Sequence, residues 1–282
     1  MSADKGTLFI VATPIGNLKD ISERAYDVLT HADLILCEDT RHSLHLLSAL
    51  NIAPAKLVSF HDHNEEDRAG FVLEQLLAGK NIALISDAGT PLVADPGFPL
   101  VRKCRKLGLT IVPIPGPSAP ITALQACGLA PIPYAFLGFL PRGLADKTKL
   151  FKAFAHVPTT LIFFERADRL KESLKNAYDV FGEREVCICR ELTKVYEEFI
   201  SINLSASGDL PELLGEITVV LGPNKDFKRT SEDELINLVS NYLQSKVKTK
   251  EIIALLQDEI SGWTKKDLYA FIENLKAHSD TI

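Results

Sequence analysis

Residues 81–97 have the sequence NIALISDAGTPLVADPG, in which a short apolar run passes directly into a loop rich in glycine and proline. The apolar residues 82–85 predict a buried strand, and Asp87 follows where that strand ends. In an open α/β sheet, small charged ligands bind outside the carboxyl ends of the strands. A second loop of this kind, PGPSA at residues 115–119, follows the next apolar run. Either loop alone is equally well explained as a stiff turn, but two such loops on successive strands predict a shared ligand site.

The composition is that of an ordinary globular protein. The 282 residues are 46% hydrophobic and 24% charged, and this length leaves room for two domains. The formal net charge of −6 argues against a protein that coats nucleic acid generally, but it permits a local basic patch. The chain has no apolar run of membrane-spanning length and no secretory signal, so we expect a cytoplasmic protein without a membrane partner. Five cysteines without a C-x-x-C pair predict neither a disulfide framework nor a zinc site.

The first part of the chain alternates apolar runs of strand length with segments of helical periodicity. The apolar runs span residues 7–13, 32–37 and 57–60, followed by the two runs described above. This alternation predicts βαβ units and a mostly parallel sheet. We therefore expect an N-terminal α/β domain over residues 1–118.

The remaining chain predicts two further parts. Aromatic-rich or β-branched runs interspersed with helical segments indicate a mixed α+β domain over residues 119–224. Its expected strands span residues 134–139, 159–164, 185–190, 195–202 and 216–221. Three helix-sized segments follow in residues 225–282, and Ser231 with Glu234 forms a capping-box pattern before the first of them. We expect these segments to form a small helical extension.

The motifs of several common enzyme classes are missing from the sequence. There is no G-x-G-x-x-G or G-x-x-x-x-G-K-[ST] phosphate loop and no G-x-S-x-G nucleophile elbow. His61 and His63 form an H-x-H pair without a third ligand in view, so we expect no metal. Acidic residues gather instead at the predicted strand ends, which suits a ligand that carries a sulfonium or an ammonium. They are Glu38, Asp39, Glu65, Asp87 and Asp95.

Five loop sequences together resemble the tetrapyrrole-methylase-like family, the class III methyltransferases that use S-adenosylmethionine. They are PIGNL at 14–18, CEDTR at 37–41, SFHDHNE at 59–65, SDAGTPLVADPG at 86–97 and PGPSA at 115–119. Further matching motifs extend the resemblance over essentially the whole chain. They are FLGFLPR at 136–142, RELTKVYEE at 190–198, GEITVVLGP at 215–223 and KKDLY at 265–269. Within the family, the motifs are similar to those of the group that methylates small-subunit ribosomal RNA.

The resemblance implies a two-domain enzyme, a homodimer, with S-adenosylmethionine bound in the cleft between the domains and with a helical extension. The reaction implied for this group is methylation of a cytidine ribose 2′-hydroxyl in the 16S rRNA of the small ribosomal subunit. Carried over to this chain, the residues that bind the cofactor are Gly16, Asp87, Ala88, Gly89, Ala94, Ser118, Ala119, Phe139, Leu140, Gly222 and Pro223.

The acceptor hydroxyl must lose a proton during such a transfer, and a general base contributes roughly 10²–10⁴-fold to the rate of such reactions. The catalytic candidates are charged residues at the predicted rim: Glu38, Asp39, Arg41 and Glu65, with His61 and Asp87 as further possible bases. Arg41 has a second possible role, which is to stabilise a developing alkoxide or to hold a phosphate. Each of these residues, taken singly, is also explained as a solvated loop residue.

Basic clusters are candidates for holding RNA despite the acidic total charge. They are Arg102, Lys103, Arg105 and Lys106; Arg142, Lys147, Lys149 and Lys152; Lys225, Lys228 and Arg229; and Lys246, Lys248 and Lys250. The second cluster is preferred because it follows a strand expected to border the cleft, and the first is better explained as a solvated helix face. The helical extension either clamps RNA or packs in the dimer. Two alternative functions remain: a methylase of a tetrapyrrole or another small acceptor, and a non-catalytic RNA-binding assembly factor.

Overall fold

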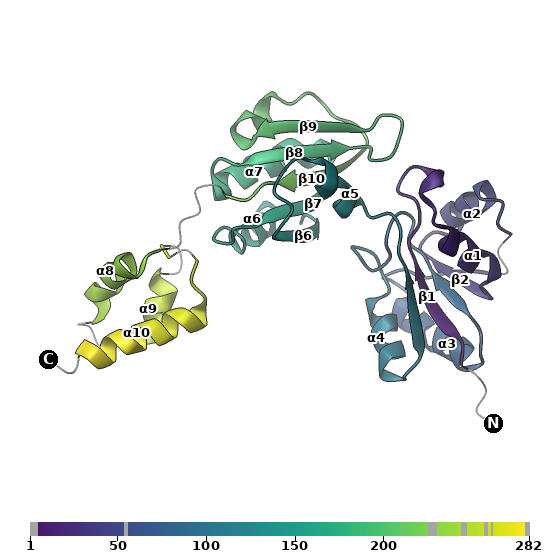
Figure 1. Cartoon of the computed structure of the whole chain (residues 1–282), viewed down its shortest axis with the longest axis horizontal. Helices are drawn as coiled ribbons and strands as arrows, with labels where there is room; N and C mark the ends of the chain where they lie inside the picture. The colour runs from purple at the N-terminus through teal and green to yellow at the C-terminus, as the bar shows by residue number, and fades with distance from the viewer. Residues whose placement is uncertain are drawn as a thin grey trace.

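The computed structural model describes residues 5–53, 56–224, 230–243, 247–256, 259–260 and 262–279. Figure 1 shows three parts in chain order: a sheet covered by helices, a second sheet with its own helices, and a group of C-terminal helices. Lys225, Lys228, Arg229 and Lys246, which belong to two of the expected basic clusters, lie outside the described residues.

The first sheet consists of five parallel strands in the order β3-β2-β4-β1-β5. Their bounds are β1 Thr7–Val11, β2 Leu34–Cys37, β3 Leu57–Ser59, β4 Ile82–Leu84 and β5 Thr110–Ile114. The predicted α/β fold with a parallel sheet is therefore confirmed. Because all five strands run the same way, their carboxyl ends and the loops that follow them meet at one edge of the sheet.

Helices cover both faces of this sheet. Along β2, Leu34 and Leu36 belong to one hydrophobic cluster and Ile35 and Cys37 to the other, as the two-residue period of a strand requires. Helices α1 Glu23–His31 and α2 Thr40–Ala49 pack on the face that contains Ile35 and Cys37. Helices α3 Glu65–Leu77 and α4 Phe98–Lys106 pack on the face that contains Leu34 and Leu36. Helix α1 begins after Ser22, because the Ser22 hydroxyl caps it by accepting a hydrogen bond from the Ala25 N–H at 3.1 Å.

Strand β1 ends two residues before the predicted position. Thr13 leaves the parallel ladder and pairs with Gly89 of the loop after β4, donating its N–H to the Gly89 carbonyl at 2.8 Å and accepting the Gly89 N–H at 3.1 Å. This pairing joins the first strand-end loop, which includes the short helix η1 Leu18–Asp20, to the loop that contains Asp87.

The second sheet is mixed, with the strand order β6-β7-β10-β8-β9. Its strands are β6 Tyr134–Phe139, β7 Thr160–Arg166, β8 Glu185–Arg190, β9 Glu198–Asn203 and β10 Glu216–Leu221. Only β6 and β7 are parallel, and the other neighbours are antiparallel. The expected strand at 195–202 begins only at Glu198, because the preceding residues form a turn in which the Glu197 carboxylate accepts the Thr193 N–H at 2.6 Å.

Helix α5 Ala119–Ala126 packs on one face of the second sheet, while α6 Leu144–Lys152 and α7 Leu170–Phe181 pack on the other. The short helices η2 Ala167–Arg169 and η3 Leu204–Asp209 adjoin α7. Cys187 and Cys189 lie on the same face of β8, and all five cysteines are free and buried. Ile15 from the first domain belongs to the cluster under α5, so apolar packing joins the two domains beside the strand-end loops.

The C-terminal part contains α8 Glu232–Leu243, α9 Thr249–Leu256 and α10 Lys265–Ser279. Their buried apolar residues form a separate core that includes Leu235, Ile252 and Ile272. The capping box is confirmed, since the Ser231 N–H donates to the Glu234 carboxylate at 2.8 Å and the Glu234 N–H donates to the Ser231 hydroxyl at 3.2 Å. Among the described residues, no helix is both long enough and apolar enough to span a bilayer.

Candidate active site

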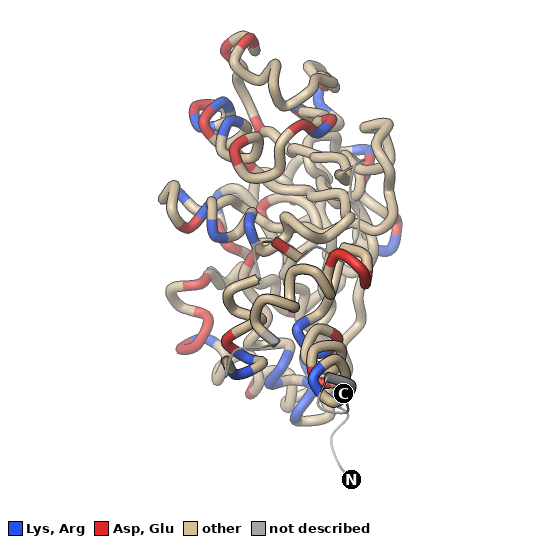
Figure 2. Tube along the Cα trace, turned by 90° about the vertical axis from the view of Figure 1, so that its left-hand side faces the viewer, with Lys and Arg blue, Asp and Glu red and all other residues tan. Residues whose placement is uncertain are grey.

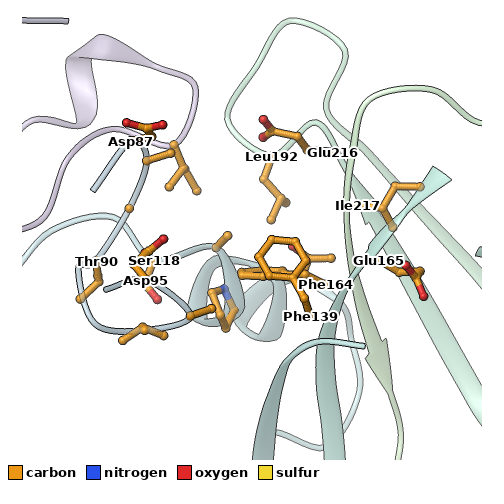
Figure 3. A pocket seen from close by; sticks show the side chains of 18 of the residues that line it. Asp87, Thr90, Asp95, Ser118, Phe139, Phe164, Glu165, Leu192, Glu216 and Ile217 are labelled. Atoms are coloured by element: carbon orange, nitrogen blue, oxygen red, sulfur yellow. The ribbon is translucent and has the colours of Figure 1, made fainter. Parts of the chain in front are cut away.

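A cavity of about 350 Å³ lies between the strand-end loops of the first sheet and one side of the second sheet. This volume is within the range of roughly 300–1,000 Å³ that is typical of small-molecule sites. Figure 3 shows Asp87, Thr90, Asp95 and Ser118 on one side, and Phe139, Phe164, Leu192 and Ile217 on the other. The first wall is therefore polar and made of loops. The second is made of strands and a turn, and it combines aromatic and aliphatic side chains with Glu165, Arg166, Glu216 and Thr218.

Asp95 is the most perturbed carboxyl group at the cavity. Its pKa is raised to about 7, mainly by partial burial and then by the negative charges of Glu38 and Asp87, while a hydrogen bond with Ser86 opposes this rise. The pKa of Glu38 is raised in turn, first by burial and then by the charges of Asp87 and Asp62. These carboxyl groups repel one another beside the cavity, so a cationic ligand would relieve the repulsion.

The two glycine-bearing loops are tied together, as their shared position in the sequence pattern predicts. The Thr90 hydroxyl donates to the Pro117 carbonyl at 2.9 Å, which links the loop after β4 to the loop after β5. Gly89 has φ +83°, and a Cβ there would lie 3.2 Å from Ile15 Cγ2. Glycine is required by this backbone conformation and by the close approach of the first strand-end loop.

The same loop contains two non-glycine residues in the left-handed region, Leu92 with φ 70° and Ala94 with φ 71°. Such conformations are uncommon outside glycine and collect at ligand sites, where the surrounding structure holds them. Gly97 closes the loop with φ +123°, and its N–H donates to the Glu65 carboxylate at 3.1 Å. Ala94 lines the cavity, so the strained segment forms part of the wall.

The opposite wall is aromatic and aliphatic. The ring of Phe139 is 62% exposed and lies 5.0 Å from that of Phe164, centroid to centroid. Leu192 continues this surface from the turn after β8, whereas Ile217 of β10 borders the cavity but has its side chain buried in the core under α6 and α7. Glu165 also lies in this wall, but its carboxylate is occupied by hydrogen bonds from Arg169, from the Ser173 hydroxyl at 2.5 Å and from the Arg166 N–H at 2.8 Å.

Seven of the expected cofactor-binding residues line this cavity: Asp87, Ala88, Gly89, Ala94, Ser118, Ala119 and Phe139. The other four do not. Gly16 packs against the turn at 192–194, where an added Cβ would lie 2.5 Å from Lys194 Cγ. Leu140 is buried in the core of the second domain, because it follows Phe139 directly. Gly222 and Pro223 follow β10 at the end opposite to the residues 215–218 that line the cavity.

None of the four catalytic candidates lines the cavity. Asp39 caps α2 and forms an ion pair with Arg41 at 3.2 Å, and hydrogen bonds from Arg41 hold its pKa below the usual range, which makes it a weak base. The side chain of Arg41 is 88% exposed. Glu65 accepts the Gly97 N–H and so supports the loop. Glu38 does not line the cavity, but its negative charge raises the pKa of Asp95, which does line it.

The preferred RNA-binding cluster at 142–152 needs a correction. The side chain of Lys147 is fully buried, and its Nζ donates to the Ser173 hydroxyl at 2.9 Å and pairs with Glu172 at 3.5 Å. Lys147 therefore holds α6 against α7 and is not available to a phosphate. Lys149 and Lys152, in the last turn of the same helix, remain exposed.

The sequence placed Asp95 among the acidic residues at the strand ends, but neither the catalytic nor the cofactor-binding candidates included it, and most of the second wall was missed. Asp95 lies within the quoted loop, in the same strand-end segment as Asp87. The residues at 164–166 and 215–218 carried no such signal, because they meet only through the antiparallel pairing of β7 with β10.

The fold and the sequence match a known family. A family model described as Tetrapyrrole (Corrin/Porphyrin) Methylases matches residues 7–206. A solved structure of diphthine synthase superposes with a TM-score of 0.60 at 14% identity, covering 77% of this chain and 90% of that one. A Thermus thermophilus uroporphyrin-III C-methyltransferase complexed with S-adenosyl homocysteine superposes with a TM-score of 0.56 at 18% identity, covering 77% and 97%. This chain belongs to the tetrapyrrole methylase family.

More similar relatives share one name, ribosomal RNA small subunit methyltransferase I. The Vibrio cholerae protein is 43% identical over 95% of this chain and 95% of its own length. The Escherichia coli O157:H7 protein is 42% identical over 96% of both chains, and the Rickettsia prowazekii protein is 38% identical over 96% of this chain and 98% of its own. The resemblance inferred from the loop motifs is thereby confirmed, down to this group within the family.

Proposed function

We propose that this protein transfers a methyl group from S-adenosylmethionine to the ribose 2′-hydroxyl of a cytidine in the 16S rRNA of the small ribosomal subunit. The observation that carries the proposal is the near full-length similarity to relatives named as small-subunit ribosomal RNA methyltransferases. The cavity between the two sheets supports it, because seven residues expected to bind the cofactor line that cavity.

The residues of the cavity fit the chemistry of the proposed cofactor. S-adenosylmethionine, when bound, supplies the methyl group from a cationic sulfonium. Asp87 and Asp95 place negative charge on one wall, which favours a cation in a partly dehydrated site. The exposed ring of Phe139 and the neighbouring Phe164 offer an aromatic surface that suits a planar base.

We assign the proton transfer to Asp95. A carboxylate with a pKa near neutrality is well matched to general-base work, and Asp95 lines the cavity, unlike the four residues first considered. A cation close to Asp95 lowers its pKa and leaves the group ionised at neutral pH. The carboxylate then accepts the proton of the 2′-hydroxyl, while the strained loop and the aromatic wall hold the acceptor and the methyl donor in line.

The proposal includes a homodimer in the cytoplasm that needs no metal. The neighbouring apolar side chains of Val195 and Tyr196, exposed at 93% and 72% in the turn after β8, support a partner surface. Sedimentation equilibrium of the purified protein measures the oligomeric state directly. A chelator added to the methylation assay should leave the rate unchanged.

The test is mass mapping of 16S rRNA from cells that lack the gene, complemented with wild type or with Asp87→Ala. One ribose methylation should be lost in the deletion strain and restored only by wild type. If the RNA pattern is unchanged but the protein binds S-adenosylmethionine, the acceptor is a tetrapyrrole or another small molecule. If rRNA is bound but S-adenosylmethionine is not, the protein is a non-catalytic assembly factor.

A further inference from the structure

A second groove, of about 410 Å³, lies in the C-terminal helical part, far in sequence from the loops of the active site. Its lining comes from one face of α9 and from the first turns of α10: Lys250, Ile253, Ala254, Lys265, Lys266 and Tyr269. None of these six residues is acidic. The groove therefore has a cationic rim, although the whole chain carries a net charge of −6.

Helix geometry explains how the lining residues come together. Lys250, Ile253 and Ala254 are spaced i, i+3 and i+4, so they share one face of α9. Lys265 and Lys266 share a face of α10 with Tyr269 in the same way. Ile253 is buried in the core of the three helices and forms an apolar floor, while the lysines are exposed at the rim.

The three rim lysines form no ion pair within the part of the chain that the structure describes. Lys276 differs from the rim lysines because its ammonium group is bound within the protein. Its Nζ donates to the Thr249 hydroxyl at 2.8 Å and to the Val247 carbonyl at 3.3 Å. The rim lysines are thus available to an external anion.

The start of α10 adds to the positive potential. Thr264 caps this 15-residue helix by accepting the Asp267 N–H at 3.1 Å, and the N-terminus of a helix carries a partial positive charge. Asp267 is the acidic residue in this turn. Its carboxylate accepts a hydrogen bond from the Thr264 hydroxyl at 2.7 Å and is therefore held by the helix cap. In Figure 2, blue basic positions lie close to the C-terminal end of the tube.

Tyr269 is 44% exposed beside these lysines. Lysines that follow a phosphate backbone, combined with an aromatic ring on which a base stacks, are the typical elements of a single-strand nucleic-acid site. We infer that the groove between α9 and α10 binds a single-stranded segment of the RNA substrate, with phosphates at Lys250, Lys265 and Lys266 and a base against Tyr269. The inference rests on the proposed function, since it takes RNA as the substrate.

The test compares the full-length protein with the triple variant Lys250→Gln, Lys265→Gln and Lys266→Gln. Binding to protein-free 16S rRNA is measured against salt concentration, and methylation is measured with small subunits from cells that lack the gene. Each neutralised phosphate contact lowers the slope of log affinity against log salt by about 0.7–0.9, so the triple variant should lose about 2–3 units of slope. S-adenosylmethionine affinity and the rate at saturating RNA should remain those of wild type.

A matched control removes the same charge from exposed positions on α4: Lys103→Gln, Arg105→Gln and Lys106→Gln. This control should keep the wild-type salt slope. Tyr269→Ala should weaken RNA binding by about 5–100-fold, as loss of one stacked base predicts, whereas Tyr269→Phe should bind as wild type does. Circular dichroism should show that all variants fold.

Two outcomes would overturn the inference while leaving the proposed function intact. In the first, wild type methylates rRNA, and the triple variant of the groove shows the same dependence of RNA affinity on salt as the α4 control. In the second, the triple loses affinity for assembled subunits but not for free rRNA, which would make the groove a site for a ribosomal protein. Failure of the proposed function is distinct, because wild type itself would then methylate no rRNA.

Discussion

The two walls of the cavity differ in both origin and chemistry. The wall of the first domain consists of loops that follow parallel strands, and it carries Asp87 and Asp95 together with left-handed backbone at Gly89 and Ala94. The wall of the second domain consists mainly of strand residues, and Phe139 with Phe164 dominates it. In the proposed function, the first wall would supply charge and accept the proton, and the second would supply shape.

Sheet topology explains this difference. Parallel strands bring all their carboxyl ends to one edge, so several loops converge there and can hold polar groups in fixed positions. The second sheet instead borders the cleft with residues of its strands, where the exposed ring of Phe139 lies against Phe164. Substitutions in the two walls should therefore change different measured quantities.

The largest effect is expected for Asp95→Asn, which keeps the shape of the charged wall but removes its base. The catalytic rate at saturating substrates should fall by about 10²–10⁴-fold, because the 2′-hydroxyl loses its proton acceptor. Single-turnover methylation of small subunits measures this rate. The matched variant Glu38→Gln removes a nearby carboxylate that does not line the cavity, and its rate should stay within a few-fold of wild type. A normal rate in Asp95→Asn would assign the base elsewhere.

A smaller effect is expected for Asp87→Asn, which tests whether the first wall recognises charge. The variant keeps an oxygen that can accept the Asp39 N–H, a hydrogen bond of 3.3 Å in the wild type. Its affinity for S-adenosylmethionine should fall by about tenfold. A nearby cation shifts the pKa of a carboxyl group by at least about one unit, and one pKa unit corresponds to a tenfold change in affinity. The affinity for S-adenosylhomocysteine, which lacks the sulfonium charge, should change little. Calorimetry with both ligands gives the ratio of the two affinities. Equal losses of affinity for both ligands would show that the first wall does not recognise the sulfonium charge.

Phe139→Ala tests the second wall and should give the opposite signature. Loss of the ring removes its contact with Phe164, and aromatic contacts contribute about 0.5–1.5 kcal/mol, so both ligands should bind roughly three- to tenfold more weakly. The ratio of their affinities should remain that of wild type. Phe139→Leu retains most of the apolar surface and serves as the control. A change confined to the charged ligand would mean that the two walls do not act separately.

The first wall was more predictable from the sequence than the second. Apolar runs alternating with helical segments predict a parallel sheet, and such a sheet places the loops at 86–97 and 115–119 together, as the bond from Thr90 to Pro117 shows. The second wall depends on the pairing of β7 with β10, two strands that are about fifty residues apart, and no local pattern encodes that pairing.

Two errors have specific physical causes. Phe139 and Leu140 were both expected in the pocket, although consecutive residues at the end of a strand point to opposite sides. Lys147 was expected at the surface because buried lysines are rare, and its partner Ser173 lies on another helix. Both errors arise where tertiary packing decides the environment of a residue.

The smallest expected effect concerns stability, and it tests the charge repulsion in the first wall without any ligand. The pKa of Asp95 rises from an ordinary 3.8 to about 7 in the folded state, first because of burial and then because of Glu38, Asp87 and, more weakly, Asp62. Between these two pH values the folded protein binds more protons than the unfolded chain, so stability is lost as the pH rises through this window.

Asp95→Asn removes the titration. Its melting temperature should approach that of wild type near pH 4 and exceed it by a few degrees at pH 8. Glu38→Gln, which removes one of the repelling charges, should shift the wild-type curve in the same direction by less. Thermal unfolding of the cofactor-free protein across this pH range measures both differences. A constant difference between Asp95→Asn and wild type at every pH would show that Asp95 is not held at a raised pKa, and the assignment of the base would lose its electrostatic support.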